Sequence, residues 1–152
     1  MGYQFELIDE KEQAVLSMRI RSAVGNLPQE FGRVYGGILQ YLEEIGEKTE
    51  GPAFGAYYNM DMENLDVEIG FIMPKPIGGK GEIQSGKIPA GKQVSCLYQG
   101  PYAEMAHVYD AMMTWIGENG HAPTGVSYEY YYNSPAEVPE SELLTRIVFP
   151  LK

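Results

Sequence analysis

The sequence is poor in cysteine and in basic residues, and it has no long apolar run. Its single cysteine, Cys96, cannot form an internal disulfide or a Cys-cluster zinc site. The chain has 11 Lys and Arg against 21 Asp and Glu, which gives a formal net charge of −10. Binding to nucleic acid needs clustered Lys and Arg side chains, so we expect no direct binding to nucleic acid. No apolar run approaches the ~18 residues of a membrane span, and the first residues do not form a signal peptide. These absences predict a soluble cytoplasmic domain that does not bind membranes.

Common catalytic and cofactor motifs are missing as well. The sequence has no HExxH, GxSxG, Walker or GxGxxG pattern. Its two histidines do not combine with Cys96 into a nucleophilic triad. We expect His107 on a solvated helix face, His121 in a loop and Cys96 in the core. The sequence therefore predicts no cofactor and no metal, and it leaves open whether the protein is an enzyme, with a non-enzymatic binding protein favoured.

The composition is otherwise that of a globular domain rich in tyrosine and glycine. The chain has 152 residues, of which 44% are apolar, and a single domain of this length buries roughly 68–70% of the surface that its unfolded chain exposes. The 12 tyrosines suit an aromatic pocket, and the 18 glycines suit a sheet fold with many turns.

The two halves of the chain resemble each other at shifts of 74 and 78 residues. The matched pairs include Tyr57–Asn59 with Tyr131–Asn133, Leu16–Met18 with Val94–Cys96, and Glu68–Phe71 with Arg146–Phe149. Two copies are too few for a solenoid. The repeat predicts one domain over residues 1–152, with halves at about 1–76 and 77–152 that join at Pro74–Gly81, a segment rich in turn formers.

Each half is predicted to run strand, helix, strand, strand. Apolar residues at three-four spacing mark one helix from about 28 to 45, capped by Asn26 and ended by Gly46, and a second that starts at Pro101 and stops at Gly120. Strands are expected at about 16–20, 53–59, 66–73, 94–98, 126–132 and 143–149, and a preceding strand at about 3–9 or 82–88 adds to each half.

Two such units must each bury one apolar helical stripe on a sheet. The predicted fold class is α+β: duplicated strand-helix-strand-strand (SHS2-type) units in one antiparallel sheet, with both helices on one face. A pseudo-two-fold axis between the helices would leave a groove floored by the sheet, the kind of concave place where small ligands bind.

Several segments, taken in order, resemble the GyrI-like domain family across nearly the whole chain. They are Gly51–Phe54 with Tyr57, Asp66–Phe71, Gly100–Tyr102, Trp115–Gly120, Tyr131–Pro135 and Thr145–Leu151. The resemblance implies the duplicated fold just described, which serves as the effector-binding part of multidrug-sensing regulators such as BmrR and of AraC-type activators. It also implies stand-alone relatives that inhibit gyrase or hydrolyse reactive cyclopropane rings. We expect no DNA-binding region here.

The chain departs from the family pattern at one charged position. The family has a glutamate one residue after the terminal threonine, and in the regulators this glutamate receives cationic, lipophilic drugs. Arg146 occupies that position here. We therefore expect neutral or anionic amphipathic ligands. Glu68, which aligns with Arg146 between the halves, matches a glutamate common in the first half of the family.

Glu68 and Arg146 are the leading polar candidates for the site. Strand alternation places the Glu68 side chain on the sheet face opposite to that of Val67 and Ile69. Glu68 and Arg146 both belong to strands expected near the axis. They could form a structural ion pair. Alternatively they form the polar floor of the groove, with Arg146 offering its planar donors to a ligand carboxylate.

Aromatic and small residues complete the expected ligand site. Tyr57 and Tyr131 occupy equivalent strands, where they either line the pocket or serve as ordinary strand residues. On one edge of the two helices, the small residues Gly37 and Ala111 would leave a gap, and the large residues Tyr41 and Trp115 would form its walls. Alternatively, the opposite edge of each helix faces the groove. Tyr102, at the start of the second helix, is a further candidate.

The sequence favours a stand-alone binding protein for amphipathic or aromatic small molecules, held in a Tyr/Trp-lined groove. One alternative is a hydrolase that opens cyclopropane-type compounds with Glu68 as the base. Another is an inhibitor of the gyrase type that binds a protein partner through the acidic first half, which has 13 acidic and 6 basic residues up to position 76.

Overall fold

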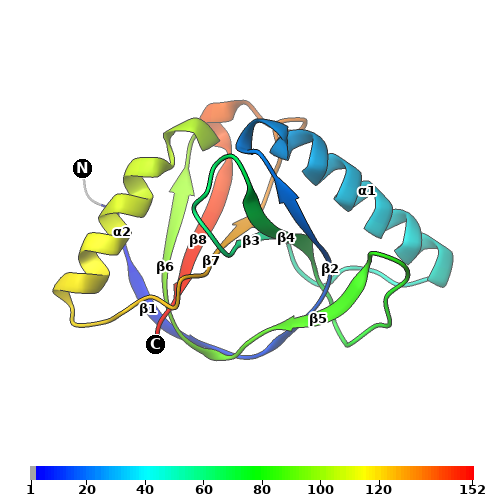
Figure 1. Cartoon of the computed structure of the whole chain (residues 1–152), viewed down its shortest axis with the longest axis horizontal. Coiled ribbons are helices and arrows are strands. Elements are labelled where there is room, and N and C mark those ends of the chain that lie inside the picture. Colours follow the sequence, from blue (N-terminus) through cyan, green and yellow to red (C-terminus); the bar gives the residue numbers. More distant parts are fainter. Residues whose placement is uncertain (1–2) are drawn as a thin grey trace. The chain divides into compact units, whose positions relative to one another are not determined.

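The computed structural model describes residues 3–152, which form two compact units (Figure 1). The central unit is Lys11–Ala90. The terminal unit combines the chain's first ten residues, described from residue 3, with Gly91–Lys152. Among residues 3–152, no helix is long and apolar enough to cross a membrane.

The central unit is an antiparallel sheet with one helix. Its strands run in the order β3-β4-β2-β5. The bounds are β2 (Gln13–Ser22), α1 (Leu27–Ile45), β3 (Ala53–Tyr57), β4 (Leu65–Ile72) and β5 (Gln84–Ile88), with a short 3₁₀ helix, Val24–Asn26, before α1.

Helix α1 forms where the three-four spacing of apolar residues predicts it. Pro28 stands in the first turn, where its missing N–H costs nothing, and Gly46 ends the helix in the left-handed conformation with φ 72°. The expected cap by Asn26 is wrong in one respect. Asn26 occupies the N-cap position, but it has helical dihedral angles, and its side chain donates or accepts no capping bond.

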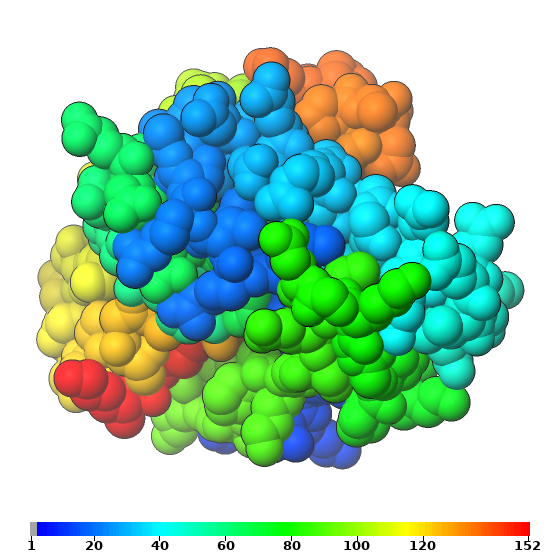
Figure 2. Space-filling view, turned by 45° about the vertical axis from the view of Figure 1, so that its right-hand side comes forward, coloured from blue at the N-terminus to red at the C-terminus, as the bar shows by residue number. Residues whose placement is uncertain are grey.

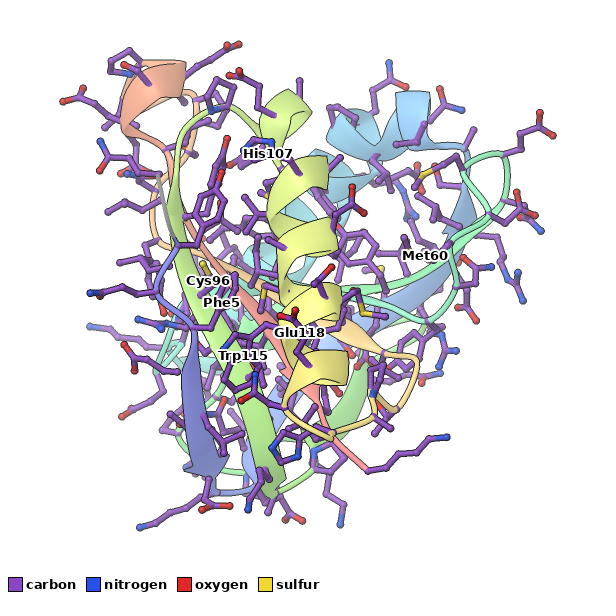
Figure 3. The ribbon with its side chains drawn as sticks, turned by 90° about the vertical axis from the view of Figure 1, so that its left-hand side faces the viewer. Phe5, Met60, Cys96, His107, Trp115 and Glu118 are labelled. Atoms are coloured by element: carbon purple, nitrogen blue, oxygen red, sulfur yellow. The ribbon has the colours of Figure 1, made fainter. Side chains whose placement is uncertain are left out.

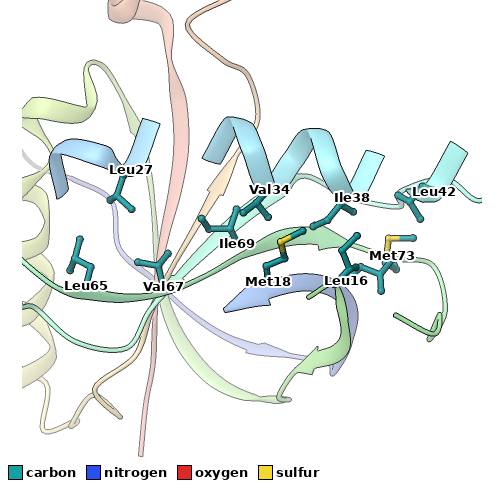
Figure 4. Packing of buried hydrophobic residues seen from close by; sticks show 11 residues of the cluster. Leu16, Met18, Leu27, Val34, Ile38, Leu42, Leu65, Val67, Ile69 and Met73 are labelled. Carbon is teal, nitrogen blue, oxygen red and sulfur yellow. The ribbon is translucent and has the colours of Figure 1, made fainter. Parts of the chain in front are cut away.

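The core of the central unit lies between α1 and the sheet (Figure 4). Val34 and Ile38 of α1 are fully buried and pack against Leu16 of β2 and Ile69 of β4. Because side chains alternate along a strand, the odd-numbered residues of β4 face α1, and the even-numbered residues face the other side of the sheet.

The terminal unit repeats this plan with the strand order β1-β6-β8-β7, also antiparallel. Its elements are β1 (Glu6–Glu10), β6 (Gly91–Gln99), α2 (Ala106–Glu118), β7 (Ser127–Tyr131) and β8 (Leu144–Pro150), with short 3₁₀ helices at Tyr102–Glu104 and Glu140–Glu142. Both units therefore have the predicted α+β composition.

Helix α2 covers the second core. Val108, Met112 and Ile116 of α2 pack against Ile147 of β8, and Cys96 is buried among them as predicted. The helix starts later than expected. Pro101 is extended (φ −65°, ψ 144°) and precedes the 3₁₀ turn Tyr102–Glu104, so it is not the first residue of α2.

The two outer strands pair differently from the expectation that each adds to its own half. β1 pairs with β6, and β5 pairs with β2, so each outer strand joins the unit built from the other half of the sequence (Figure 1). Alternation predicts that a segment is a strand, but it does not encode the partner, and the two halves offer similar partners.

The predicted joint between the halves lies on the surface of the central unit, against α1. The Tyr41 hydroxyl donates to the Gly78 carbonyl at 2.6 Å, and Lys80 pairs with Glu44 at 3.5 Å. Lys75 pairs with Glu47 at 3.3 Å. Figure 2 shows this green segment against the blue and cyan surface of α1. The two lysines balance acidic residues at the end of α1, where the helix dipole disfavours them.

Candidate functional site

A half-buried carboxylate in the terminal unit is held by two tyrosines. Glu129 lies on β7 directly opposite Ile147, a core residue, so its side chain faces α2. Its carboxylate accepts a hydrogen bond from the hydroxyl of Tyr109 on α2 and another, at 2.7 Å, from the hydroxyl of Tyr131 on β7. Helix and strand thus converge on one acidic group.

The pKa of Glu129 is raised above its ordinary value. Removal of the carboxylate from water is the main cause, although the residue as a whole keeps some exposure, and the bonds from Tyr109 and Tyr131 partly oppose the shift. Among residues 3–152, no Lys or Arg forms an ion pair with Glu129. A carboxylate in such an environment attracts a cation or a proton.

Aromatic rings surround this carboxylate. Tyr109 makes an edge contact with Phe149 at 5.4 Å between ring centroids, and Tyr102 makes an edge contact with Tyr131 at 5.9 Å. Tyr102 is 41% exposed, and its pKa is raised by burial and by the charge of Glu129. We call Tyr102, Tyr109, Glu129 and Tyr131 the Glu129 cluster.

Thr145 lies beside the Glu129 cluster on β8. It is directly opposite Tyr131 in the register, and it is fully buried. Its Oγ1 is a buried side-chain polar atom with no hydrogen-bond partner among residues 3–152. Buried hydroxyls are nearly always satisfied, so this one can bond to a polar atom that enters the cluster.

Glu129 was not among the residues predicted from the sequence, although a signal for it exists. It stands two residues before Tyr131 in a predicted strand, and alternation places both on one face. The similarity between the halves does not mark Glu129, because Gly55 occupies the position 74 residues earlier. A charged residue that occurs in only one half does not appear among the residues that the two halves share.

Glu68, the proposed polar floor and hydrolase base, lies on the sheet face that points away from α1. Its carboxylate accepts hydrogen bonds from Ser17 at 2.6 Å and from Tyr58 at 2.5 Å. The guanidinium of Arg19 lies over the Tyr58 ring, 3.7 Å from its centroid. The alternation predicted for Glu68 is confirmed, but its assignment to the helix side of the sheet is wrong, because Val67 and Ile69 occupy that side.

Arg146 has the corresponding position in the terminal unit, on the face that points away from α2. It donates from Nη1 to Ser95 at 2.7 Å and from Nε to Tyr132 at 3.0 Å. Its expected place on the helix side is wrong for the same reason, since Ile147 faces α2. An approach of Glu68 to Arg146, and a groove between the two helices, stay predictions.

The helix residues expected to form the walls of the site lie on the flank of each helix that is opposite Tyr109 of α2 or Tyr35 of α1. Trp115 stacks on His121 and touches Phe5, just before the outer strand β1, at 6.2 Å (Figure 3). Ala111 is on the same flank by its i,i+4 spacing. In the central unit, the Tyr41 hydroxyl donates to the carbonyl of Gly78 in the Pro74–Gly81 joint, and Gly37 lies over Met18 of β2. The opposite edge, with Tyr109 and Tyr35, faces β7 and β3.

For the remaining predicted site residues, a role in ligand binding stays a prediction. Tyr57 of β3 is on the α1 side of its sheet and packs partly buried against the core. Tyr131 and Tyr102 belong to the Glu129 cluster. His107 is exposed on α2, and His121 follows the helix end, as predicted. Among residues 3–152, no group of three or more His, Cys, Asp or Glu could hold a metal ion.

Comparisons with known proteins agree with this fold. A family model described as a GyrI-like small molecule binding domain matches residues 1–152. The crystal structure of the EcmrR C-terminal domain has a TM-score of 0.85 at 24% identity and covers 100% of this chain and 99% of that chain. In the EcmrR–DNA complex, the match has the same score and identity and covers 99% of this chain, which spans only 57% of that longer chain.

More distant structures share the fold at lower identity. A hydrolase encoded by lin2189 from Listeria innocua has a TM-score of 0.71 at 15% identity and covers 99% of this chain and 92% of that chain. SAV2435, bound to tetraphenylphosphonium, has a TM-score of 0.62 at 11% identity, covering 98% and 94% respectively. No curated protein matches the chain.

Proposed function

Because the chain belongs to the GyrI-like small-molecule-binding domain family, we propose that it binds an aromatic or amphipathic small molecule carrying a cationic group. The Glu129 cluster forms the polar end of the site. The observation that carries the proposal is the Glu129 carboxylate, half-buried, held by Tyr109 and Tyr131 and with no basic partner among residues 3–152.

A bound cation would supply the charge that Glu129 lacks. Removal of a carboxylate from water is costly unless an opposite charge or enough hydrogen bonds compensate. Two tyrosine hydroxyls compensate in part, which leaves the pKa of Glu129 raised. A ligand cation close to the carboxylate would lower that pKa again, and the favourable coupling between the two charges is binding free energy.

The tyrosine rings suit the rest of such a ligand. An aromatic face attracts a cation within about 6 Å of its centroid and also packs against apolar or planar groups. Tyr102, 41% exposed and in contact with Tyr131, can change its rotamer without unfolding α2, because it belongs to the 3₁₀ turn that precedes the helix. We propose that it closes over the ligand.

This ligand class differs from the neutral or anionic one expected from Arg146 alone. That expectation considered only the position where the family carries its terminal glutamate. Glu129 restores a carboxylate to the helix side of the same sheet, so a cation-binding group is present although residue 146 is basic.

The test is a titration with tetraphenylphosphonium, the lipophilic cation bound to SAV2435. Calorimetry should show binding to the wild type and at least about tenfold weaker binding to Glu129→Gln, since a charged interaction of roughly 1.5–3 kcal/mol is lost. Glu118→Gln, an exposed position on α2, is the matched control. Equal affinity in Glu129→Gln and wild type, or no binding to the wild type, would contradict the proposal.

Hydrolysis of a strained, cyclopropane-type compound is a second candidate function, with Glu129 in place of Glu68 as the base. A raised pKa brings a carboxyl group closer to the range useful for proton transfer at neutral pH, and the Tyr131 hydroxyl is next to it. Ring opening measured by chromatography should stop in Glu129→Gln and continue in Glu68→Gln. If wild type opens the ring no faster than buffer does, this candidate is excluded.

A further inference from the structure

We infer that the Thr145 hydroxyl sets the specificity of the Glu129 cluster, by selecting ligands that carry a neutral hydrogen-bonding group in addition to the cation. The inference rests on the proposed function, because it concerns the same ligand. Thr145 is fully buried, and its Oγ1 forms no hydrogen bond among residues 3–152. A buried hydroxyl without a partner has lost its bonds to water and gained none in return, so the fold does not explain its presence.

The side chains beside Thr145 direct their own hydroxyls elsewhere. In the register, Thr145 of β8 lies between Tyr98 of β6 and Tyr131 of β7, and the three side chains share the face that meets α2. The Tyr98 hydroxyl donates to the Pro101 carbonyl at 2.8 Å. The Tyr131 hydroxyl donates to the Glu129 carboxylate at 2.7 Å. The hydroxyl in the middle of this row is therefore left for a group that comes from outside the chain.

The equivalent row in the central unit shows that packing alone needs no hydroxyl at this position. Val67 of β4 lies between Ile20 of β2 and Tyr57 of β3 in the register, and it is fully buried in the core under α1. Valine and threonine have the same branched shape, with a methyl group in one where the other has a hydroxyl. The polar atom of Thr145 thus adds nothing that the core of such a unit requires.

Thr145 lies close enough to Glu129 for one ligand to contact both. Glu129 and Tyr131 alternate onto the same face of β7, and Thr145 is directly opposite Tyr131. Diagonal neighbours on adjacent antiparallel strands have Cα atoms about 7–8 Å apart. A cation beside the carboxylate and a neutral polar group a few bonds away fit this spacing. Because a threonine hydroxyl both donates and accepts, a ligand hydroxyl is a suitable partner for it.

The neighbours of Thr145 are both tied to the turn that carries Tyr102. Tyr131 makes an edge contact with Tyr102, with 5.9 Å between the ring centroids. Tyr98 bonds to Pro101, the residue that precedes this turn. We therefore expect that the rotation of Tyr102 proposed for ligand entry also gives access to Thr145.

The experiment compares two derivatives of tetraphenylphosphonium by calorimetry on the intact chain. One carries a hydroxymethyl group in the para position of one ring, and the other carries an ethyl group of the same size there. Wild type should bind the hydroxymethyl compound about two- to tenfold more tightly, which is the effect of one neutral hydrogen bond. Thr145→Val should bind the two compounds equally. Thr145→Ser, which keeps the hydroxyl, and Thr114→Val, the same change at an exposed position of α2, should keep the preference.

Urea unfolding without ligand gives a second measurement. Because Thr145→Val removes a buried hydroxyl that has no partner, the variant should unfold at the same urea concentration as wild type or at a higher one. A lower midpoint would show that the hydroxyl has a partner within the fold, and it would overturn the inference.

Equal binding of the two compounds by wild type, or a preference that persists in Thr145→Val, would also overturn the inference. The ethyl compound separates these results from a failure of the proposed function, because it offers the cation alone. If it binds wild type, and binds Glu129→Gln at least about tenfold more weakly, the proposed function holds whatever the preference between the compounds is. If wild type binds neither compound, the proposed function and this inference are both wrong.

Discussion

Tyr109 of α2 donates a hydrogen bond to Glu129 of β7, whereas the corresponding Tyr35 of α1 donates to the backbone carbonyl of Phe54 at 3.3 Å. Each tyrosine also contacts a phenylalanine of its own unit, Tyr109 with Phe149 of β8 and Tyr35 with Phe71 of β4. The aromatic framework is thus common to the two halves, and the carboxylate is present in one of them. We therefore expect recognition of a charged ligand on the helix side to depend on Glu129.

Stability should depend on pH through Glu129. A carboxyl group whose pKa is raised by folding binds its proton more readily in the native state, so its favourable contribution is complete below its ordinary pKa and is lost as pH rises through the raised value. Glu129→Gln removes this loss. In urea unfolding without ligand, the variant should gain stability relative to wild type as pH rises from about 4 to 7. A difference that does not vary with pH would show that Glu129 titrates normally.

The two tyrosine hydroxyls should oppose that shift measurably. They lower the pKa of Glu129, although less than burial raises it. Tyr131→Phe should therefore raise the pKa of Glu129 further and shift the pH midpoint of tetraphenylphosphonium binding upward, with the aromatic contact to Tyr102 retained. Tyr35→Phe, which removes the corresponding hydroxyl in the central unit, should leave the midpoint unchanged. Equal midpoints in wild type and Tyr131→Phe would mean that this bond does not form in solution.

Helix and strand positions follow from the sequence because apolar spacing reports burial directly. The stripe containing Val34 and Ile38, and its counterpart with Val108 and Met112, fix which side of each helix meets a sheet. They do not distinguish the two flanks beside that stripe. The sequence therefore places Trp115 at the ligand site with the opposite helix edge as the alternative, and in the structure Trp115 packs beside Phe5.

The partners of strands and charges are harder to predict because they depend on long-range pairing. The alternation in β1 fits an edge beside β2 as well as one beside β6, and the register that decides between them joins residues far apart in sequence. For Glu68 and Arg146, alternation correctly predicts that they face away from their apolar neighbours. Which face carries the helix is settled only by packing.

Gly70 should be intolerant of any side chain because β2 and β4 approach closely there. A Cβ atom at residue 70 would lie 2.1 Å from the carbonyl oxygen of Leu16 and 2.7 Å from the Ser17 Cβ, and neither can move without disrupting the strand pairing. Gly70→Ala should lower the free energy of unfolding by about 3 kcal/mol or more. Gly36→Ala, in open space on α1, should raise it by about 0.5–1 kcal/mol. A Gly70→Ala protein as stable as wild type in urea would contradict the close approach.

Trp115 should report on the N-terminal segment and hardly at all on the Glu129 cluster. It is the only tryptophan, and its ring makes an edge contact with the Phe5 ring, with 6.2 Å between the centroids, on the flank of α2 opposite Tyr109. Phe5→Ala should expose the indole, shift its emission to longer wavelength and cost about 1–3 kcal/mol, because Phe5 is only partly buried. Leu7→Ala, on the 44% exposed side chain two residues further, should change emission little.

Saturating tetraphenylphosphonium should likewise leave the Trp115 emission maximum of the wild type in place, while calorimetry shows heat of binding. The ligand is expected between Tyr102, Tyr109 and Tyr131, and the buried residues Met112 and Ile116 separate that side of α2 from Trp115. A wavelength shift on ligand addition that persists in Glu129→Gln would place the ligand on the Trp115 flank instead, as the sequence alone predicts.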